Sequence, residues 1–84
     1  MNYVIAVFMS RSETLSFANM LKKINVPVAI VQTPRQAGKT CGISVKFHYE
    51  NFSYAKDLLS RMRLNSFYGF LVEDDSFGSY KIVK

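Results

Sequence analysis

Cys41 is the residue whose setting most suggests chemistry, since it is the only cysteine in the sequence. It follows the segment 33–40, in which Pro34 fixes one backbone angle and Gly38 permits a positive φ, so we expect a turn there. The thiolate form of a cysteine attacks disulfides, accepts a sulfur atom as a persulfide, and binds metals. Many free cysteines are instead buried and unreactive. The position of Cys41 therefore leaves both a reactive and an inert thiol open.

Other residue patterns argue against a metal site and a nucleotide site. His48 is the only histidine, and no cysteine stands at ligand spacing from it, so the sequence predicts no metal centre. The run Gly38-Lys39-Thr40 ends like a phosphate-binding loop, but that motif needs a glycine at Thr33 and a helix afterwards, where we expect a strand. We therefore expect no cofactor. These patterns leave enzymatic activity open, and a non-catalytic protein is the simpler expectation.

Length and composition predict a single globular domain over residues 1–84. Hydrophobic residues make up 49% of the chain and charged residues 20%, which suits a folded core rather than a long disordered tail. A lone cysteine excludes an internal disulfide, and no apolar stretch approaches the roughly 20 residues that a membrane helix needs. We therefore expect a soluble, cytoplasmic protein with no membrane partner.

Hydrophobic periodicity predicts five strands and two helices. The strands are expected at 2–8, 28–31, 42–49, 67–73 and 80–83, and the helices at about 11–24 and from 51 or 53 to about 63. The βαββαβ order of the first six elements is typical of a ferredoxin-like two-layer α+β sandwich, in which one antiparallel sheet carries both helices on one face. The segment 80–83 would add a short C-terminal strand.

The first helix carries the clearest local signals. Ser10 and Glu13 have the spacing of a capping box, in which the serine accepts from a backbone N–H and the glutamate reaches back to the serine's own N–H. Asn25 and Pro27 are expected to end the helix. The apolar stripe predicted for it consists of Leu15, Ala18, Leu21 and Ile24, with Phe17 and Met20 beside them.

The ferredoxin-like connections place three segments at one end of the sheet, namely 9–12, 34–41 and 63–67. Cys41 would then lie near the N-terminus of the first helix, whose backbone N–H groups are those of Ser10 to Ser12. A positive helix end and nearby cations favour a thiolate over a thiol. The cations that this topology brings to the same end are Arg11, Arg35, Lys39 and Arg63.

The other face of the sheet suggests an alternative function. Both faces of strand 2–8 are apolar, whereas strand 42–49 alternates apolar residues with the polar Ser44, Lys46 and His48. An uncovered apolar sheet face indicates a binding partner or a homodimer. The alternative is therefore a non-catalytic module that forms a homodimer or senses a small ligand through this open face.

The net charge of +5 favours anionic partners and raises the question of nucleic acid. RNA-recognition domains share this topology and carry a set pattern of glycine, aromatic and basic residues on the third strand. Residues 42–49 do not match that pattern. We therefore do not expect nucleic acid as the partner.

The pattern of Pro34 and Arg35 followed by Cys41 and Gly42, between an apolar strand and an alternating one, resembles the putative selenium/sulfur carrier protein-like family of small bacterial proteins. The resemblance covers nearly the whole chain. It implies that Cys41 carries a sulfur or selenium atom transiently, as a persulfide or selenosulfide, between donor and acceptor proteins. Arg35 would stabilise the anion, Gly42 would let the backbone approach closely, and Ser10, Arg11 and Ser12 would supply the helix N-terminus.

Overall fold

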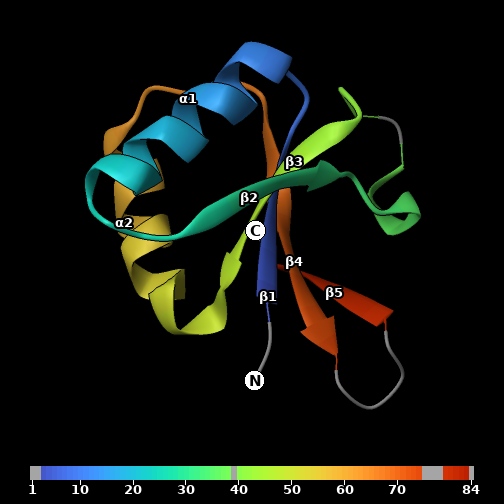
Figure 1. The fold of residues 1–84 in the computed structure, drawn as a ribbon. Coiled ribbons are helices and arrows are strands. Elements are labelled where there is room, and N and C mark those ends of the chain that lie inside the picture. The colour runs from blue at the N-terminus through green and yellow to red at the C-terminus, as the bar shows by residue number, and fades with distance from the viewer. Residues whose placement is uncertain (1–2, 39, 75–78, 84) are drawn as a thin grey trace.

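The computed structural model describes residues 3–38, 40–74 and 79–83 (Figure 1). Their element order agrees with the sequence-based prediction, with two short 3-10 turns added. The elements are β1 (Tyr3–Phe8), α1 (Arg11–Lys23), β2 (Val28–Gln32), η1 (Arg35–Ala37), β3 (Ile43–His48), η2 (Tyr49–Asn51), α2 (Phe52–Arg61), β4 (Phe67–Asp74) and β5 (Ser79–Val83).

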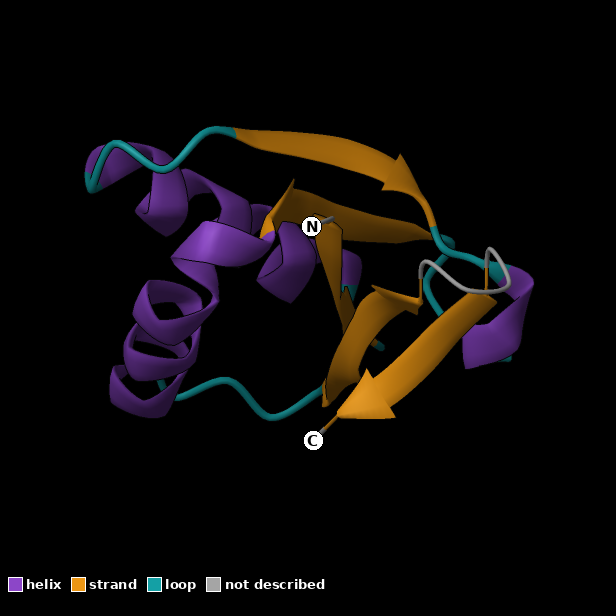
Figure 2. Cartoon of the chain, turned by 90° about the horizontal axis from the view of Figure 1, so that it is seen from below, coloured by secondary structure: helices purple, strands orange, loops and turns teal. Residues whose placement is uncertain are grey.

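All strand pairs are antiparallel, and the strand order is β2-β3-β1-β4-β5. Both helices lie on one face of the sheet (Figure 2). The order β2-β3-β1-β4 with two helices on one face is the ferredoxin-like arrangement, so the predicted fold class is confirmed. β5 pairs with β4 as the predicted additional strand. The loop predicted at 74–78 falls largely on residues 75–78, which lie outside the described residues.

The main core lies between the helices and the sheet. β1 contributes every second residue, Val4, Ala6 and Phe8, because successive side chains of a strand point to opposite faces. Aromatic rings fill the centre, with the Phe8 ring 5.3 Å from the rings of both Phe17 and Phe67, centroid to centroid. This packing fixes the end of β1 firmly against α1 and β4.

The register of α1 differs from the predicted stripe. Its buried residues are Thr14, Phe17, Ala18 and Leu21, while Leu15 and Ile24 are exposed. The buried set follows the i, i+3, i+4, i+7 spacing of one helix face. The polar Thr14 therefore occupies the position that apolar patterning alone assigns to Leu15.

The sheet face opposite the helices is partly covered by the chain itself. Ile5, Val7 and Leu71 form a second buried cluster with Ala37 of η1, which lies across the sheet from α1 and α2 (Figure 1). Ser44, which the alternating pattern predicted on a solvent-exposed face, is also buried, and its hydroxyl lies 2.6 Å from the hydroxyl of Thr33. The expectation of an uncovered face is thus wrong at its centre. The β2–β3 connection is long enough to fold back over it.

Both ends of α1 are capped, and a residue with a left-handed backbone conformation, Asn25, follows its C-cap. The Asn25 N–H donates to Lys22 O and the Val26 N–H to Leu21 O, each at 3.0 Å, and Asn25 has φ 65°. This pair of bonds satisfies helix carbonyls that would otherwise lack partners. α2 is shorter than expected, ending at Arg61, because its C-cap residue Met62 takes an extended backbone conformation.

Candidate functional site

The three segments predicted to meet at one end of the sheet do lie together. The Met9 N–H donates to Ser66 O at 2.8 Å, and the Ser10 N–H donates to Ser66 Oγ at 3.1 Å. The Cys41 thiol donates to the carbonyl of Phe8 at 3.5 Å. The end of β1, the start of α1, the residue before β4 and the turn that bears Cys41 therefore form one site.

Cys41 is half-buried, and its sulfur contacts three oxygen atoms. They are the carbonyls of Phe8 and Ile43, at 3.5 and 3.4 Å, and the hydroxyl of Thr14, at 3.6 Å. Thr14 is fully buried, and its hydroxyl donates to Ser10 O at 2.9 Å. With its one hydrogen engaged there, the hydroxyl presents only lone pairs to the sulfur. All three oxygen atoms around Sγ are therefore placed to accept a hydrogen bond from the thiol.

A thiolate at Cys41 would gain a donor from the protein only through a rearrangement within this pocket. Carbonyl oxygens cannot donate to a thiolate, so among the described contacts of Sγ only the Thr14 hydroxyl can do so, by turning its hydrogen away from Ser10 O. Ser10 O would keep a partner, because the Thr14 N–H also donates to it at 3.0 Å. Sequence patterning missed Thr14. The signal available was a threonine four residues after the N-cap serine, where its hydroxyl reaches the serine carbonyl.

The predicted helix N-terminus is well formed but does not contact the sulfur. Ser10 is the N-cap, and its Oγ accepts from the Glu13 N–H at 3.3 Å and lies 3.0 Å from Ser12 Oγ. Arg11 is exposed as the first residue of α1. In the described part of the chain, none of Ser10, Arg11 and Ser12 has a hydrogen bond to Cys41.

The turn that bears Cys41 uses its special residues for backbone conformation. Pro34 precedes η1 with φ −60°, Gly38 ends it with φ 74°, and Gly42 has φ 93°. A Cβ added at Gly42 would meet no atom within 4 Å, so this glycine supplies a positive φ rather than a close approach. Arg35 is exposed, and among the described residues it has no ion pair or hydrogen bond with Cys41. Arg63 is exposed as well, and Lys39 lies outside the described residues.

Glu13 fixes the loop before β4 to the start of α1. Contrary to the capping-box expectation, its carboxylate does not reach back to Ser10. It accepts instead from Ser66 Oγ at 2.6 Å, from the Ser66 N–H at 2.8 Å and from the Asn65 N–H at 3.1 Å. These bonds, that of the Ser66 hydroxyl foremost, hold the pKa of Glu13 below its ordinary value of 4.5.

Glu13 should make stability depend on pH. A lowered pKa in the folded state contributes stability that is complete above about 4.5 and is lost as the pH falls through the folded value. We expect Glu13→Gln to lower the Tm at about pH 7 and the difference from wild type to shrink at about pH 3. Glu50→Gln is the matched control. That carboxylate is exposed, and its contact with His48 Nδ1 is a long one, at 3.9 Å. An equal pH dependence in both variants would contradict the role of Glu13.

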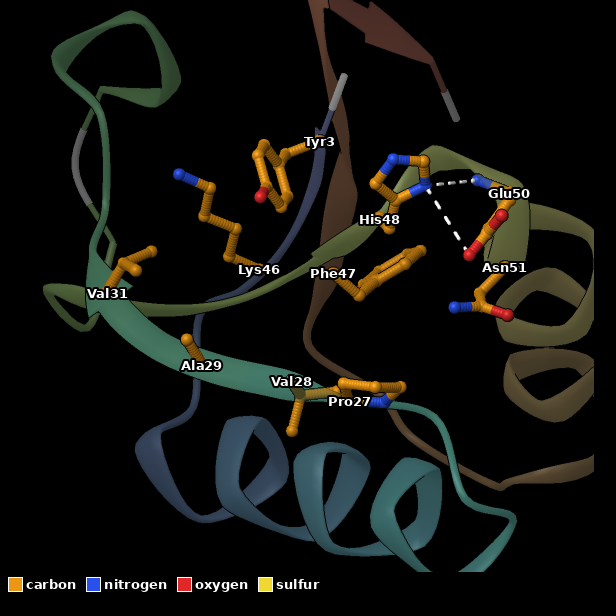
Figure 3. Close-up of a pocket in the computed structure, with 10 residues that line it drawn as sticks. All are labelled: Tyr3, Pro27, Val28, Ala29, Val31, Lys46, Phe47, His48, Glu50 and Asn51. Carbon is orange, nitrogen blue, oxygen red and sulfur yellow. Dashed lines mark hydrogen bonds and ion pairs between the residues drawn. The ribbon is translucent and has the colours of Figure 1, made fainter. Parts of the chain in front are cut away.

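A separate open cleft of about 520 Å³ lies beside β2, and Cys41 is not among its lining residues (Figure 3). Lys46 Nζ sits 4.4 Å from the centroid of the Tyr3 ring, and the His48 ring stands edge-on to the same ring at 5.7 Å. His48 Nδ1 accepts from the Glu50 N–H at 3.1 Å, so a neutral His48 carries its proton on Nε2. Ala29 and Val31 of β2 also line the cleft.

Metal-ligating side chains do not cluster in the part of the chain that the structure describes. There, no three His, Cys, Asp or Glu residues are placed to hold a metal ion together. Neither of the described α-helices has the length and apolar character needed to cross a membrane.

A comparison with protein families identifies the chain. The family model described as "Putative Se/S carrier protein-like" matches residues 3–67. The chain belongs to this family. The match to the Se/S carrier protein-like family runs from β1 to the first residue of β4 and includes Pro34, Arg35, Cys41 and Gly42. The resemblance seen in the sequence is thereby confirmed. No curated protein and no solved structure gives a match to the chain.

Proposed function

We propose that the chain is a cytoplasmic carrier that holds one sulfur or selenium atom on Cys41. The observation that carries this proposal is the membership of the Se/S carrier protein-like family, combined with a single cysteine in the sequence. The position of Cys41 adds support, because its thiol is half-buried rather than sealed in the core. A partly shielded thiol can meet a donor protein and still protect a reactive sulfur chain from other thiols.

The transfer step balances without any oxidant or reductant. The Cys41 thiolate attacks the outer sulfur of a persulfide R–S–SH on the donor, forming the new S–S bond of Cys41–S–SH. The bond between the two donor sulfurs breaks, and the donor leaves as the thiolate R–S⁻ with the electron pair. Selenium would be carried in the same way, as Cys41–S–SeH formed from R–S–SeH. In the release step, a thiolate of the acceptor protein attacks the outer sulfur of Cys41–S–SH, and Cys41 leaves as its thiolate.

The residues around Cys41 are assigned the following roles in the proposed transfer. The Thr14 hydroxyl turns toward the sulfur and donates to its charged form, and the N-terminus of α1 at Ser10 to Ser12 favours negative charge nearby. Arg35, with Arg11 as a second cation, stabilises the anion through solvent-screened attraction. Pro34 and Gly42 set the backbone of the turn that presents the thiol.

Intact-mass spectrometry of protein purified without reductant tests the proposal. We expect a fraction of the wild-type chain to gain the mass of one sulfur or one selenium atom, and that gain to vanish after treatment with a reductant. Cys41→Ser should show no such gain. An unmodified wild-type chain that also fails to accept sulfur from a small persulfide donor would rule the carrier function out.

The cleft beside β2 favours a second candidate, a module that binds a small anionic ligand. Lys46 Nζ and the Nε2–H of His48 flank the Tyr3 ring there, above the apolar side chains of Ala29 and Val31 (Figure 3). A small carboxylate with an apolar body would match this lining. Under this function Cys41→Ser leaves activity intact and Lys46→Ala removes it, the reverse of the outcome for a carrier.

A further inference from the structure

β2 leaves one side of its backbone unpaired at the edge of the sheet. Among the described strands it stands first in the strand order, pairs only with β3, and forms the rim of the sheet (Figure 2). An exposed edge strand presents a row of free N–H and C=O groups that another strand can join. This edge is independent of Cys41 and of the carrier function.

The register of β2 with β3 shows which backbone groups are free. The Thr33 N–H donates to Gly42 O, so Thr33 and Gly42 occupy a hydrogen-bonded position of the ladder. Such positions alternate along an antiparallel pair, which makes Val31 and Ala29 the next two residues bonded to β3. The N–H and C=O groups of Val28, Ile30 and Gln32 therefore point outward.

β2 lacks the features by which edge strands usually avoid association. Lysine, proline, bulges and covering loops are the common protections. The five residues Val28–Gln32 include no charged residue and no proline, and the Ile30 side chain is 42% exposed. The opposite edge, β5, carries Lys81. In a chain with a net charge of +5, β2 is an uncharged strip where two copies can meet without placing like charges face to face.

We propose that two copies of this chain pair through β2 in antiparallel fashion, about a two-fold axis at Ile30, and so form one continuous ten-stranded sheet. In this register Ile30 faces Ile30 of the second copy, and Val28 faces Gln32, each pair exchanging two backbone hydrogen bonds. The register uses the full length of β2, which Pro27 and Pro34 bound on either side. Any other symmetric register shortens the ladder.

The pairing also bears on the cleft. Ala29 and Val31 lie on the cleft side of β2, and in the proposed register Ala29 of one copy faces Val31 of the other. The second copy thus extends the apolar wall of each cleft. A foreign extended segment could use the same edge, but the self-complementary register about Ile30 favours a second copy.

Sedimentation equilibrium of the purified chain tests the pairing. We expect a monomer–dimer equilibrium, and Ile30→Lys should raise the dissociation constant about a hundredfold or more, because two ammonium groups then face each other at the axis. Ile82→Lys is the matched control, since Ile82 is 43% exposed on the other edge strand, β5. A wild-type monomer at all concentrations, or a dimer lost in Ile82→Lys and kept in Ile30→Lys, would overturn the proposal.

Disulfide trapping in a Cys41→Ser background tests the register. Facing residues of an antiparallel pair have Cα atoms about 5.5 Å apart, within the range for a disulfide. Ile30→Cys should therefore cross-link to itself under oxidation. Val28→Cys should not, because its copies would lie about 14 Å apart along the ladder, but a mixture with Gln32→Cys should give the mixed dimer. A dimer that cross-links in neither experiment would show that β2 is not the interface. Neither outcome depends on sulfur transfer.

Discussion

Phe8→Ala is expected to lower the Tm by more than about 12 °C. Phe8 is fully buried at the end of β1, between the rings of Phe17 and Phe67. Truncation of a buried phenylalanine to alanine costs roughly 3–5 kcal/mol, and a domain of this size loses roughly 4–8 °C per kcal/mol. Against a total stability of about 5–15 kcal/mol, the loss brings the chain close to unfolding.

Thermal unfolding followed by circular dichroism measures this effect. Leu15→Ala is the control, because Leu15 lies on the same helix that covers Phe8 but is exposed to solvent. Substitutions at such surface positions usually change stability by less than about 0.5 kcal/mol. Equal melting temperatures for the two variants would contradict the assignment of Phe8 to the core and of Leu15 to the surface.

Thr14→Val is expected to slow the alkylation of Cys41 by iodoacetamide about tenfold at neutral pH. The Cys41 thiol has three oxygen acceptors for its one hydrogen, so removal of the Thr14 hydroxyl destabilises the thiol form little. The thiolate form loses the one donor among its described contacts. A hydrogen bond to a charged group contributes about 1.5–3 kcal/mol, and about 1.4 kcal/mol corresponds to a factor of ten.

Two further variants make the test specific. Thr14→Ser keeps the hydroxyl and should keep the alkylation rate, which separates hydrogen bonding from a change in packing at this buried position. Arg35→Ala should slow the reaction less than Thr14→Val does, because the exposed guanidinium acts through solvent. Equal rates for wild type and Thr14→Val would remove the hydroxyl from the proposed mechanism.

The sequence was sufficient where local patterns determine the structure. Alternation and short apolar runs located all five strands, and Ser10 caps α1 as its spacing predicts. The left-handed Asn25 and the positive φ of Gly38 follow from residue type in the same way. The strand order then follows from the element order, because few topologies suit a βαββαβ chain.

Features that depend on contacts between distant segments escaped prediction. Glu13 bonds to Asn65 and Ser66, more than fifty residues away, and nothing near Glu13 distinguishes these partners from Ser10. The burial of Ile5 beneath Ala37 likewise depends on how the β2–β3 connection folds back. Thr14 was missed because a buried threonine breaks the apolar pattern by which a helix face is recognised.

Burial on both faces makes β1 a poor candidate for movement if Cys41 gains an atom, as the proposed function requires. Val4, Ala6 and Phe8 pack under the helices, while Ile5 and Val7 pack under η1, so the carbonyl of Phe8 beside the sulfur is held on both sides. Gly38 and Gly42, by contrast, have open space where a side chain would stand. Under the proposed carrier function, room for a second atom on Sγ would therefore come from the turn that holds Gly38 and Gly42, whose positive φ angles disfavour any other residue at these two positions.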